Sequence, residues 1–191
     1  FQENVGVIKT RNKAIKAAKG EFILQLDGDD LLHPEYLSWT SPILTGNPNV
    51  GIAYCKTELI GAKFGVWDLG EYSLKNQLTT NQIVVTALFR KGDFLKTNGY
   101  NEAFTKGYED WDFWLSILGL GLGAQEVNKV GFYYIILPNS RNSSFSKEVE
   151  QELKSLIFKG HQDLYLSEGL DSGDVLYHAL AKPLKNPFEY T

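Results

Sequence analysis

Three carboxylates surround one glycine in the segment Asp27-Gly28-Asp29-Asp30, which directly follows the short apolar run Glu21 to Leu26. Such a run suits a buried strand, and open α/β sheets bind their ligands at the carboxyl ends of such strands. Like charges this close repel one another unless a cation neutralises them. Mg²⁺ and Mn²⁺ take oxygen ligands and bridge to substrate phosphates. The segment therefore predicts a metal–diphosphate site with Asp27, Asp29 and Asp30 as metal ligands.

A tight turn is the simpler interpretation of the same residues, because Asp and Gly both favour turns and helix starts. Pro34 and Glu35 follow shortly afterwards and predict that a helix opens there. A strand, an acidic turn and a proline-started helix form a more specific pattern than Asp-Gly-Asp alone.

A second acidic cluster, Gly107 to Asp112, opens a helix that we expect to run to about Leu118. Apolar residues spaced i, i+3, i+4 and i+7 form its core stripe, namely Trp111, Trp114, Leu115 and Leu118. Asp110 projects from the flank of that stripe. It is either an acid favoured by the helix dipole or a general base that takes a proton from a hydroxyl. The aromatic residues offer apolar faces to sugar rings, and we assign Tyr108 and Trp111 to acceptor binding.

Arg11 lies near the middle of the apolar stripe of a helix expected from Val7 to Ala18. A buried arginine needs a carboxylate, a phosphate or several carbonyl groups. Two interpretations stay open: a salt bridge to Asp27 or Asp30, and a contact with a diphosphate. Asn12 beside it either pins a loop or contacts the ligand.

These residues must be positioned by alternating strands and helices. We expect strands at 21–26, 50–60, 81–90 and 125–137, and helices at 7–18, 35–44, 91–97, 107–118, 148–166 and 175–181. Residues 61–78 read as a long loop, and loops of that length often act as lids or contact substrates. We expect a catalytic domain over residues 1–145 and a helical extension over 146–191.

Composition narrows the classes of function. The chain has 191 residues, is 43% hydrophobic and carries a net charge of -4, which indicates a packed core and excludes a basic field for nucleic acid. The longest apolar run, Val130 to Leu137, is too short to cross a bilayer. The lone Cys55 reads as a core residue, which suits a reducing cytoplasmic setting. A chain that starts at Phe1 and lacks Met is expected to be a fragment.

Taken in order, the motifs resemble those of family 2 glycosyltransferases of the GT-A fold. The similar segments are Asn4 to Gly6, Arg11 to Ile15, Ala18 to Ile23, Leu26 to Asp30, Thr86 to Arg90, Gly99 to Glu102 and Gly107 to Asp112. The resemblance implies an α/β GT-A fold with a mixed, mostly parallel sheet flanked by helices. Family members begin with a strand-helix-strand unit that holds the nucleotide base, and this chain starts after the position of that unit.

The resemblance also implies a function, namely divalent-metal-dependent transfer of a sugar from a nucleotide-diphosphate donor, with inversion at the anomeric carbon. The acceptor would be a saccharide or a lipid-linked hydroxyl, met in the cytoplasm, with the inner face of the membrane as one option. Asp27 and Asp29 match the family's Asp-x-Asp motif, with Asp30 as a further ligand of Mg²⁺ or Mn²⁺.

Further residues match by the same resemblance. Asp110 matches the catalytic base, with Glu109 beside it, and Arg11 and Asn12 match the segment that lines the donor pocket. Arg141 would replace the family's Tyr-Arg segment near the last strand.

Two other functions suit the same acids. One is a metal-dependent nucleotidyltransferase or phosphohydrolase, in which Asp110 has no catalytic role. The other is a non-catalytic sugar-binding scaffold. His161 lies in a predicted helix, where a histidine with satisfied hydrogen bonds is commoner than a metal ligand.

Overall fold

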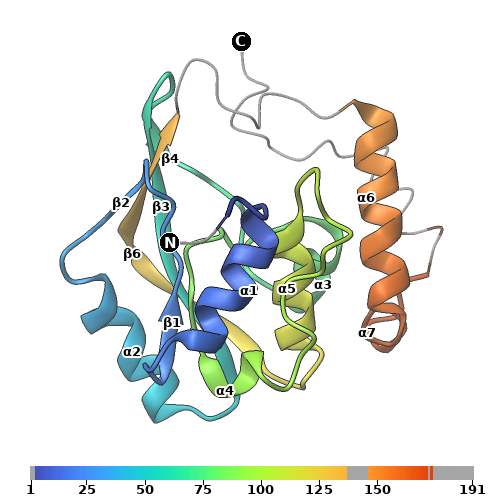
Figure 1. Ribbon diagram of the computed structural model, residues 1–191, viewed down its shortest axis with the longest axis horizontal. Helices are drawn as coiled ribbons and strands as arrows, with labels where there is room; N and C mark the ends of the chain where they lie inside the picture. The colour runs from blue at the N-terminus through green and yellow to red at the C-terminus, as the bar shows by residue number, and fades with distance from the viewer. Residues whose placement is uncertain (1–2, 137–145, 172, 174–191) are drawn as a thin grey trace.

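The structure is a computed structural model, and it describes residues 3–136, 146–171 and 173. Figure 1 shows a sheet with α2 on one side and α5, α3, α6 and α7 on the other. The helices are α1 (Val7–Ala17), α2 (Tyr36–Gly46), α3 (Leu74–Thr79), α4 (Lys91–Phe94), α5 (Glu109–Leu118), α6 (Lys147–Gly160) and α7 (Gln162–Ser167). The strands are β1 (Phe22–Leu24), β2 (Leu31–Leu32), β3 (Val50–Gly61), β4 (Gly65–Val66), β5 (Leu88–Arg90) and β6 (Gly123–Ile136).

The strands form one mixed sheet in the order β1-β5-β3-β6-β2, with β4 paired to β3 outside this path. Only β3 and β6 pair in parallel, and the other four described pairings are antiparallel. The expectation of a mixed sheet is confirmed, whereas the expectation of a mostly parallel one is wrong for the described strands. One of the antiparallel pairings has a simple explanation, because only residues 62–64 separate β3 from β4, and a parallel pair needs a crossover of about a dozen or more residues.

Alternation along β3 divides the core between the two faces of the sheet. Ile52 and Tyr54 pack into the cluster that contains α5, while Ala53 and Cys55 belong to clusters on the α2 side. This period of two is what a strand buried on both faces requires. Cys55 is 1% exposed, which confirms it as a core residue.

The face that carries α5 is closed by aromatic rings and by the last two helices. Phe113 stacks on Tyr100 with ring centroids 4.3 Å apart and meets Phe89 edge-on at 5.1 Å. Residues of α6 and α7 join the same cluster, and the Tyr165 hydroxyl donates to the Leu78 carbonyl at 2.6 Å. The helical extension therefore shares its core with the preceding part of the chain. None of the described helices has both the length and the apolar character needed to span a membrane.

Several elements differ in length from those that the sequence predicts. The expected strands at 21–26 and 81–90 are strands only over β1 and β5, and the expected helix at 148–166 is split into α6 and α7. The expected loop at 61–78 contains β4 and all but the last residue of α3. Before β5, the Gln82 amide donates to the Gln77 side chain at 2.7 Å, so side chains satisfy the backbone there. The helix expected at 175–181 lies outside the described residues.

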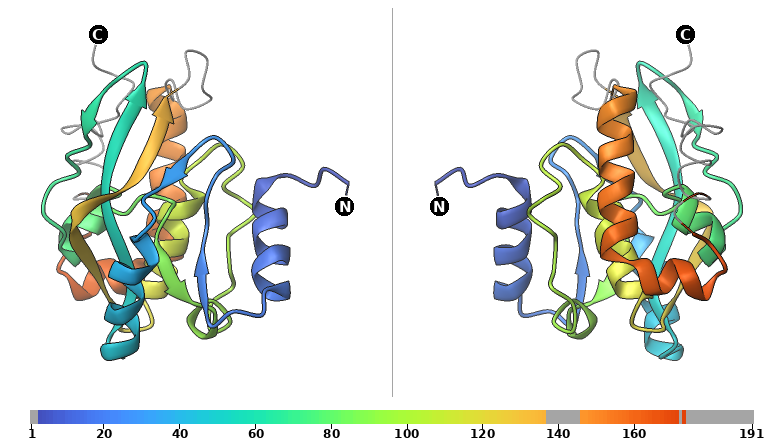
Figure 2. Two further views of the ribbon diagram at one scale, coloured as in Figure 1. Left: turned by 90° about the vertical axis from the view of Figure 1, so that its left-hand side faces the viewer. Right: turned by 90° about the vertical axis from the view of Figure 1, so that its right-hand side faces the viewer.

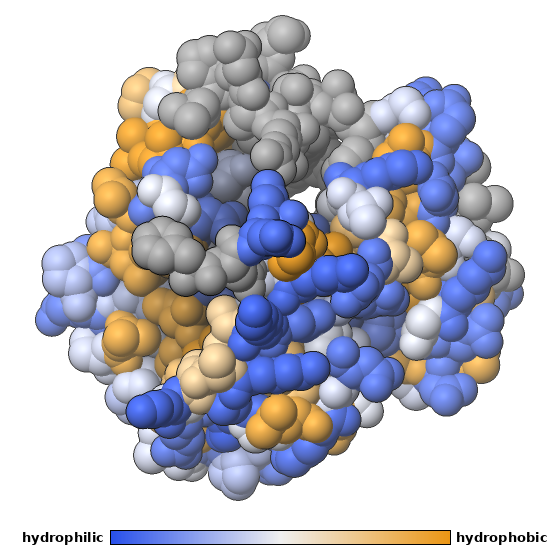
Figure 3. Space-filling model, in the orientation of Figure 1, coloured by the Kyte–Doolittle hydropathy of each residue, from blue (hydrophilic) through white to orange (hydrophobic). Residues whose placement is uncertain are grey.

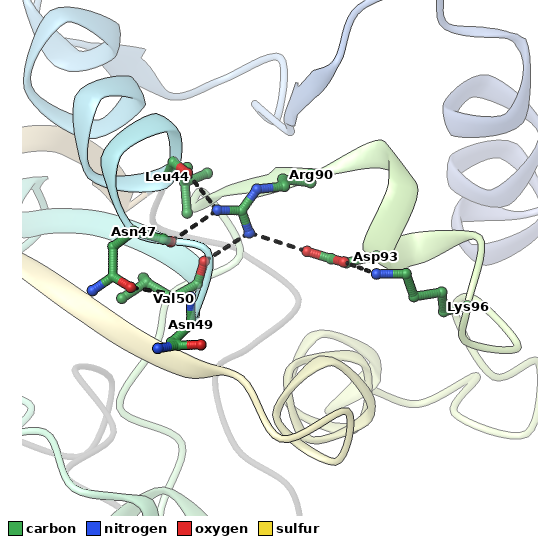
Figure 4. A network of polar contacts seen from close by, with 7 residues as sticks. All are labelled: Leu44, Asn47, Asn49, Val50, Arg90, Asp93 and Lys96. Carbon is green, nitrogen blue, oxygen red and sulfur yellow. Dashed lines mark hydrogen bonds and ion pairs between the residues drawn. The ribbon is translucent and has the colours of Figure 1, made fainter.

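Arg90 fixes the end of β5 against α2 and the start of β3 (Figure 4). Its guanidinium donates to the carbonyls of Val50 at 2.7 Å and Asn47 at 3.0 Å, and also to that of Leu44. It pairs in addition with Asp93 at 3.2 Å. A cation that satisfies the last carbonyls of a helix stabilises that helix end. These contacts therefore fix the positions of α2, β3 and β5 relative to one another.

Candidate active site

Arg11 joins the two acidic segments. Its Nη2 contacts Asp27 Oδ1 at 2.8 Å and its Nη1 contacts Glu109 Oε1 at 2.8 Å. The arginine side chain is only 11% exposed. It lies on the face of α1 that also carries the buried residues Ile8 and Ile15. One guanidinium therefore places the acidic turn and the start of α5 on the same side of the molecule. Of the two carboxylate partners that the sequence left open for Arg11, the structure shows Asp27.

The helix that carries Arg11 lies at the edge of the molecule, alongside β1 (Figure 2). Its outer side is hydrophilic (Figure 3) and exposes Lys9, Lys13 and Lys16. The Lys91 ammonium donates to the carbonyl of Lys16 at 2.9 Å and to that of Ala18 at 2.6 Å, which satisfies the end of the helix. Arg11 is thus presented from a helix that is anchored at its carboxyl end.

The acidic turn directs its carboxylates differently. The Asp30 amide donates to the Asp27 carbonyl at 3.2 Å, so the segment is a turn, as its composition favours. Asp29 is exposed. Asp30 is 5% exposed, and its Oδ1 accepts from the Ile135 amide at 2.9 Å, while its Oδ2 is buried without a hydrogen-bond partner. Burial, with added repulsion from Asp29 and Asp27, raises the pKa of Asp30 to about 6.

This geometry tests the expected metal ligands. No three His, Cys, Asp or Glu side chains of the described residues lie close enough together to hold one metal ion, so the predicted set of three ligands is not gathered. The reason is that Asp27 is held by Arg11 and Asp30 turns toward β6. Mg²⁺ at a diphosphate commonly takes only one or two protein carboxylates. The exposed Asp29 and the unpartnered Oδ2 of Asp30 fit a site of that kind.

Asp110 stands in the first turn of α5 with a donor on each oxygen. Oδ1 accepts from the Trp111 amide at 2.8 Å, and Oδ2 accepts from Asn81 Nδ2 at 3.2 Å. Burial, and then the charge of Glu109, raise the pKa of Asp110 to about 7, against the opposing effects of the Trp111 amide and Arg11. A carboxyl with a pKa near neutrality is suited to general base catalysis. Glu109 is different, because Arg11 already holds its carboxylate.

The two aromatic residues assigned to the acceptor have different surroundings. Trp111 is 1% exposed and its Nε1 donates to the Gln77 carbonyl at 2.7 Å, so its ring is part of the core. Its assignment to acceptor binding is therefore wrong for this structure, because a buried ring has no face for a sugar. Tyr108 is half-buried, with a φ of 64° at the start of α5. A left-handed conformation in a bulky residue is uncommon and often marks a functional site.

Asn12 pins the loop that leads to α5. Its Nδ2 donates to the Tyr100 carbonyl and its Oδ1 accepts from the Tyr100 amide, both at 2.8 Å. This is the loop-pinning alternative that the sequence left open. Its expected contact with the donor stays a prediction.

We expect Gly99→Ala to lower the free energy of unfolding by about 1–3 kcal/mol. Gly99 has a φ of +71°, and an added Cβ would lie 2.6 Å from Asn12 Oδ1. Urea unfolding measures the effect, and Gly92→Ala is the matched control, because a Cβ there meets nothing within 4 Å. Equal stability of the two variants would contradict this view of the Asn12–Tyr100 contact.

The remaining residues considered for the site are His161, Arg141 and two amides that the sequence analysis did not name. His161 Nε2 contacts Asp112 Oδ1 at 2.9 Å, which gives the histidine a hydrogen-bond partner in the protein. Arg141 lies outside the described residues. Asn81 and Gln77 were missed by the sequence analysis. The only signal for Asn81 was its place at the start of the expected strand at 81–90.

Comparison with known proteins gives consistent matches. Residues 1–94 match the sequence profile described as Glycosyl transferase family 2. An uncharacterized glycosyltransferase of Haemophilus influenzae is 30% identical over 125 residues, which are 61% of this chain and 42% of that protein. The Escherichia coli UDP-Glc:alpha-D-GlcNAc-diphosphoundecaprenol beta-1,3-glucosyltransferase WfaP is 26% identical over 208 residues, covering 97% of this chain and 71% of that protein.

A solved structure shares the fold. The crystal structure of S. aureus TarS 1-349 in complex with UDP-GlcNAc superposes with a TM-score of 0.62 at 20% identity, over 85% of this chain and 53% of that one. The α/β fold predicted from the sequence is confirmed by this match. The chain spans about half the length of the first relatives that it matches, 42% and 54%.

Proposed function

The chain carries part of a glycosyltransferase family 2 domain with the GT-A fold, and from that premise we propose that the protein transfers a sugar from a nucleotide-diphosphate donor to an acceptor hydroxyl. The observation that carries the proposal is the pair of contacts made by Arg11 at 2.8 Å to Asp27 and at 2.8 Å to Glu109. They bring an acidic turn suited to a metal–diphosphate next to a helix start that presents a carboxyl group suited to act as a base.

On the donor side, Asp29 and Asp30 would hold Mg²⁺ or Mn²⁺, and Arg11 and Asp27 would line the donor pocket. A bound divalent cation would neutralise the charge that develops on the departing diphosphate. Arg11 adds a fixed positive charge nearby, and its position does not depend on the cation because both of its carboxylate partners belong to the protein.

On the acceptor side, Asp110 would take the proton of the acceptor hydroxyl. The oxygen of that hydroxyl forms its bond to the anomeric carbon while the bond to the diphosphate breaks, and the diphosphate leaves with the electron pair. A single displacement with one base inverts the anomeric carbon and needs no covalent sugar intermediate. Tyr108, half-buried beside Trp111 at a ring distance of 5.3 Å, is the aromatic residue left to contact the acceptor.

The names of the relatives support a class of substrate. TarS has been crystallised with UDP-GlcNAc, and WfaP is named for a UDP-glucose donor and a diphosphoundecaprenol-linked acceptor. We therefore propose a uridine-diphosphate sugar as donor and a saccharide or lipid-linked saccharide as acceptor. A lipid-linked acceptor would place the reaction at the cytoplasmic face of a membrane.

We expect Asp29→Ala to abolish the Mn²⁺-dependent binding of UDP by the full-length protein. Asp29 is the exposed carboxylate of the turn, and its removal leaves the cation with only the buried Oδ2 of Asp30 as a proposed protein ligand. A thermal-shift panel of nucleotide diphosphates, with and without Mn²⁺, measures this and also identifies the base. Asp163→Ala removes an exposed acid on α7 and is the control. Undiminished Mn²⁺-dependent binding by Asp29→Ala would reject the assignment of Asp29.

A further inference from the structure

A chain of two side-chain amides ends on Asp110. It begins at Gln77 in α3, which is 0% exposed. The Oε1 of Gln77 accepts from the Gln82 backbone amide at 2.7 Å, and a backbone amide can only donate. The oxygen of the Gln77 side chain is thereby identified. Its Nε2 consequently points at Asn81, where it donates to Oδ1 at 2.9 Å.

The orientation of Asn81 follows in the same way. Its Oδ1 accepts from Gln77 and also from the Ile83 backbone amide at 3.3 Å. With two donors on that oxygen, the Asn81 Nδ2 must face the other way, and it donates to Asp110 Oδ2 at 3.2 Å. The direction of each hydrogen bond in the chain is therefore fixed by backbone groups, which cannot reverse.

We propose that Asn81 is a positioning residue for Asp110, whose amide, oriented by Gln77 and by the Ile83 backbone, holds the carboxylate by Oδ2 and favours its charged form. The proposal rests on the proposed role of Asp110 as the base. The Trp111 amide holds Oδ1 at 2.8 Å, so the carboxylate is fixed at both oxygens. Each oxygen keeps a lone pair, which leaves room for the hydrogen of an acceptor hydroxyl.

The neighbours of Gln77 make the amide chain rigid. The Gln77 carbonyl accepts from Trp111 Nε1 at 2.7 Å, so this residue contacts both the Asn81 side chain and the helix that carries Asp110. The Gln82 side chain donates to the carbonyls of Leu69 at 3.1 Å and Glu71 at 2.8 Å. The segment before β5 is thus held by its own side chains, and Asn81 cannot turn away without breaking several of these bonds.

The charged groups around Asp110 determine how the loss of the Asn81 amide would change the pKa of Asp110. Glu109 from the same helix opposes ionisation, and Arg11 from α1 favours it. The Tyr100 phenol, from the loop before α5, also faces Asp110. Asn81 supplies a neutral donor from the segment before β5. With burial already raising the pKa of Asp110 to about 7, removal of a donor to its charged form raises that pKa further.

The test uses Asn81→Ala in the full-length protein. We expect the acid limb of the pH profile of kcat to move up by about one pH unit, as the loss of one hydrogen bond to a carboxylate predicts. We also expect kcat at neutral pH to fall about 10-fold, with the KM for the donor nearly unchanged. Asn76→Ala removes an exposed asparagine from the same helix as Gln77 and is the matched control. An acid limb that does not move would overturn the proposal.

Two further measurements distinguish a failure of this inference from an unfolded variant and from a failure of the proposed function. Asn81→Asp preserves the shape of the side chain and replaces the donor by an acid, so it should move the acid limb upward even if the alanine variant unfolds. Titration of the Asp110 carboxyl carbon by NMR reports its pKa without any turnover. A carboxyl pKa equal in the wild-type protein and the Asn81 variant would refute the role of Asn81, whereas full activity of Asp110→Asn would refute only the base.

Discussion

Replacing Asp110 by asparagine is expected to lower kcat by about 10²–10⁴-fold and to leave Mn²⁺-dependent binding of UDP intact. The new side chain has the same shape, and its carbonyl oxygen can still accept from the Trp111 amide, as Asp110 does at 2.8 Å. It cannot take a proton from an acceptor hydroxyl. Initial rates and calorimetry with UDP on the same preparation measure the two effects.

The other proposed functions give different results for the same variant. A nucleotidyltransferase or phosphohydrolase that used only the Asp27–Asp30 turn would keep its turnover in Asp110→Asn. A scaffold would bind saccharide in calorimetry with neither Mn²⁺ nor a nucleotide. Loss of transfer with donor binding retained is thus specific to the transferase.

The pH dependence of the wild-type protein follows from the same residue. The pKa of Asp110 is raised to about 7, so the carboxyl is mostly protonated below that pH and mostly ionised above it. A base acts in its ionised form, and kcat should therefore rise with pH through about 7 and then level off. A wild-type profile of kcat that is flat between pH 5 and 9, or that falls with rising pH, would contradict the assignment of Asp110 as the base.

The sequence predicts best those elements whose pattern depends on neighbours along the chain. The strand expected at 50–60 agrees with β3 to within one residue, and the helix expected at 107–118 agrees with α5 to within two residues. Their apolar periods are long and uninterrupted, so the local signal was strong. The strand expected at 81–90 is mostly irregular, because the side chains of Gln77, Asn81 and Tyr36 bond to its backbone groups in place of a neighbouring strand.

For contacts between residues far apart in sequence, the chemical type of the partner could be predicted but not the partner itself. A buried arginine must have a carboxylate or a phosphate, and Arg11 contacts Asp27, which lies 16 residues away. Its second partner, Glu109, lies 98 residues away and no local pattern points to it. The same holds for the amides of Gln77 and Asn81. The assignment of Trp111 to acceptor binding was a different kind of error. Its place in the apolar stripe of the helix already favoured a position in the core over contact with a sugar.

We expect Arg11→Gln to lower the free energy of unfolding by about 2–3 kcal/mol, at or just below the lower limit of the range of about 3–5 kcal/mol for breaking a buried ion pair. The arginine side chain is 11% exposed and Glu109 18%, but Asp27 is 46% exposed, so water screens part of the loss. The measurement is urea unfolding. Lys9→Gln removes an exposed partner of Glu102, where both side chains are more than half exposed, and should cost less than about 1 kcal/mol.

The same variant tests the coupling between the two acidic segments. Arg11 favours the ionised form of Asp110, so its replacement by a neutral side chain should also move the acid limb of kcat to higher pH. Arg11→Lys keeps the charge but not the planar fork that reaches two carboxylates at 2.8 Å each, so it should restore the pH profile more fully than the stability. If the lysine variant recovered stability but not the profile, the guanidinium would act on Asp110 through geometry and not through charge. The two acidic segments would then be linked mechanically, with Arg11 as the connection between the donor side and the base.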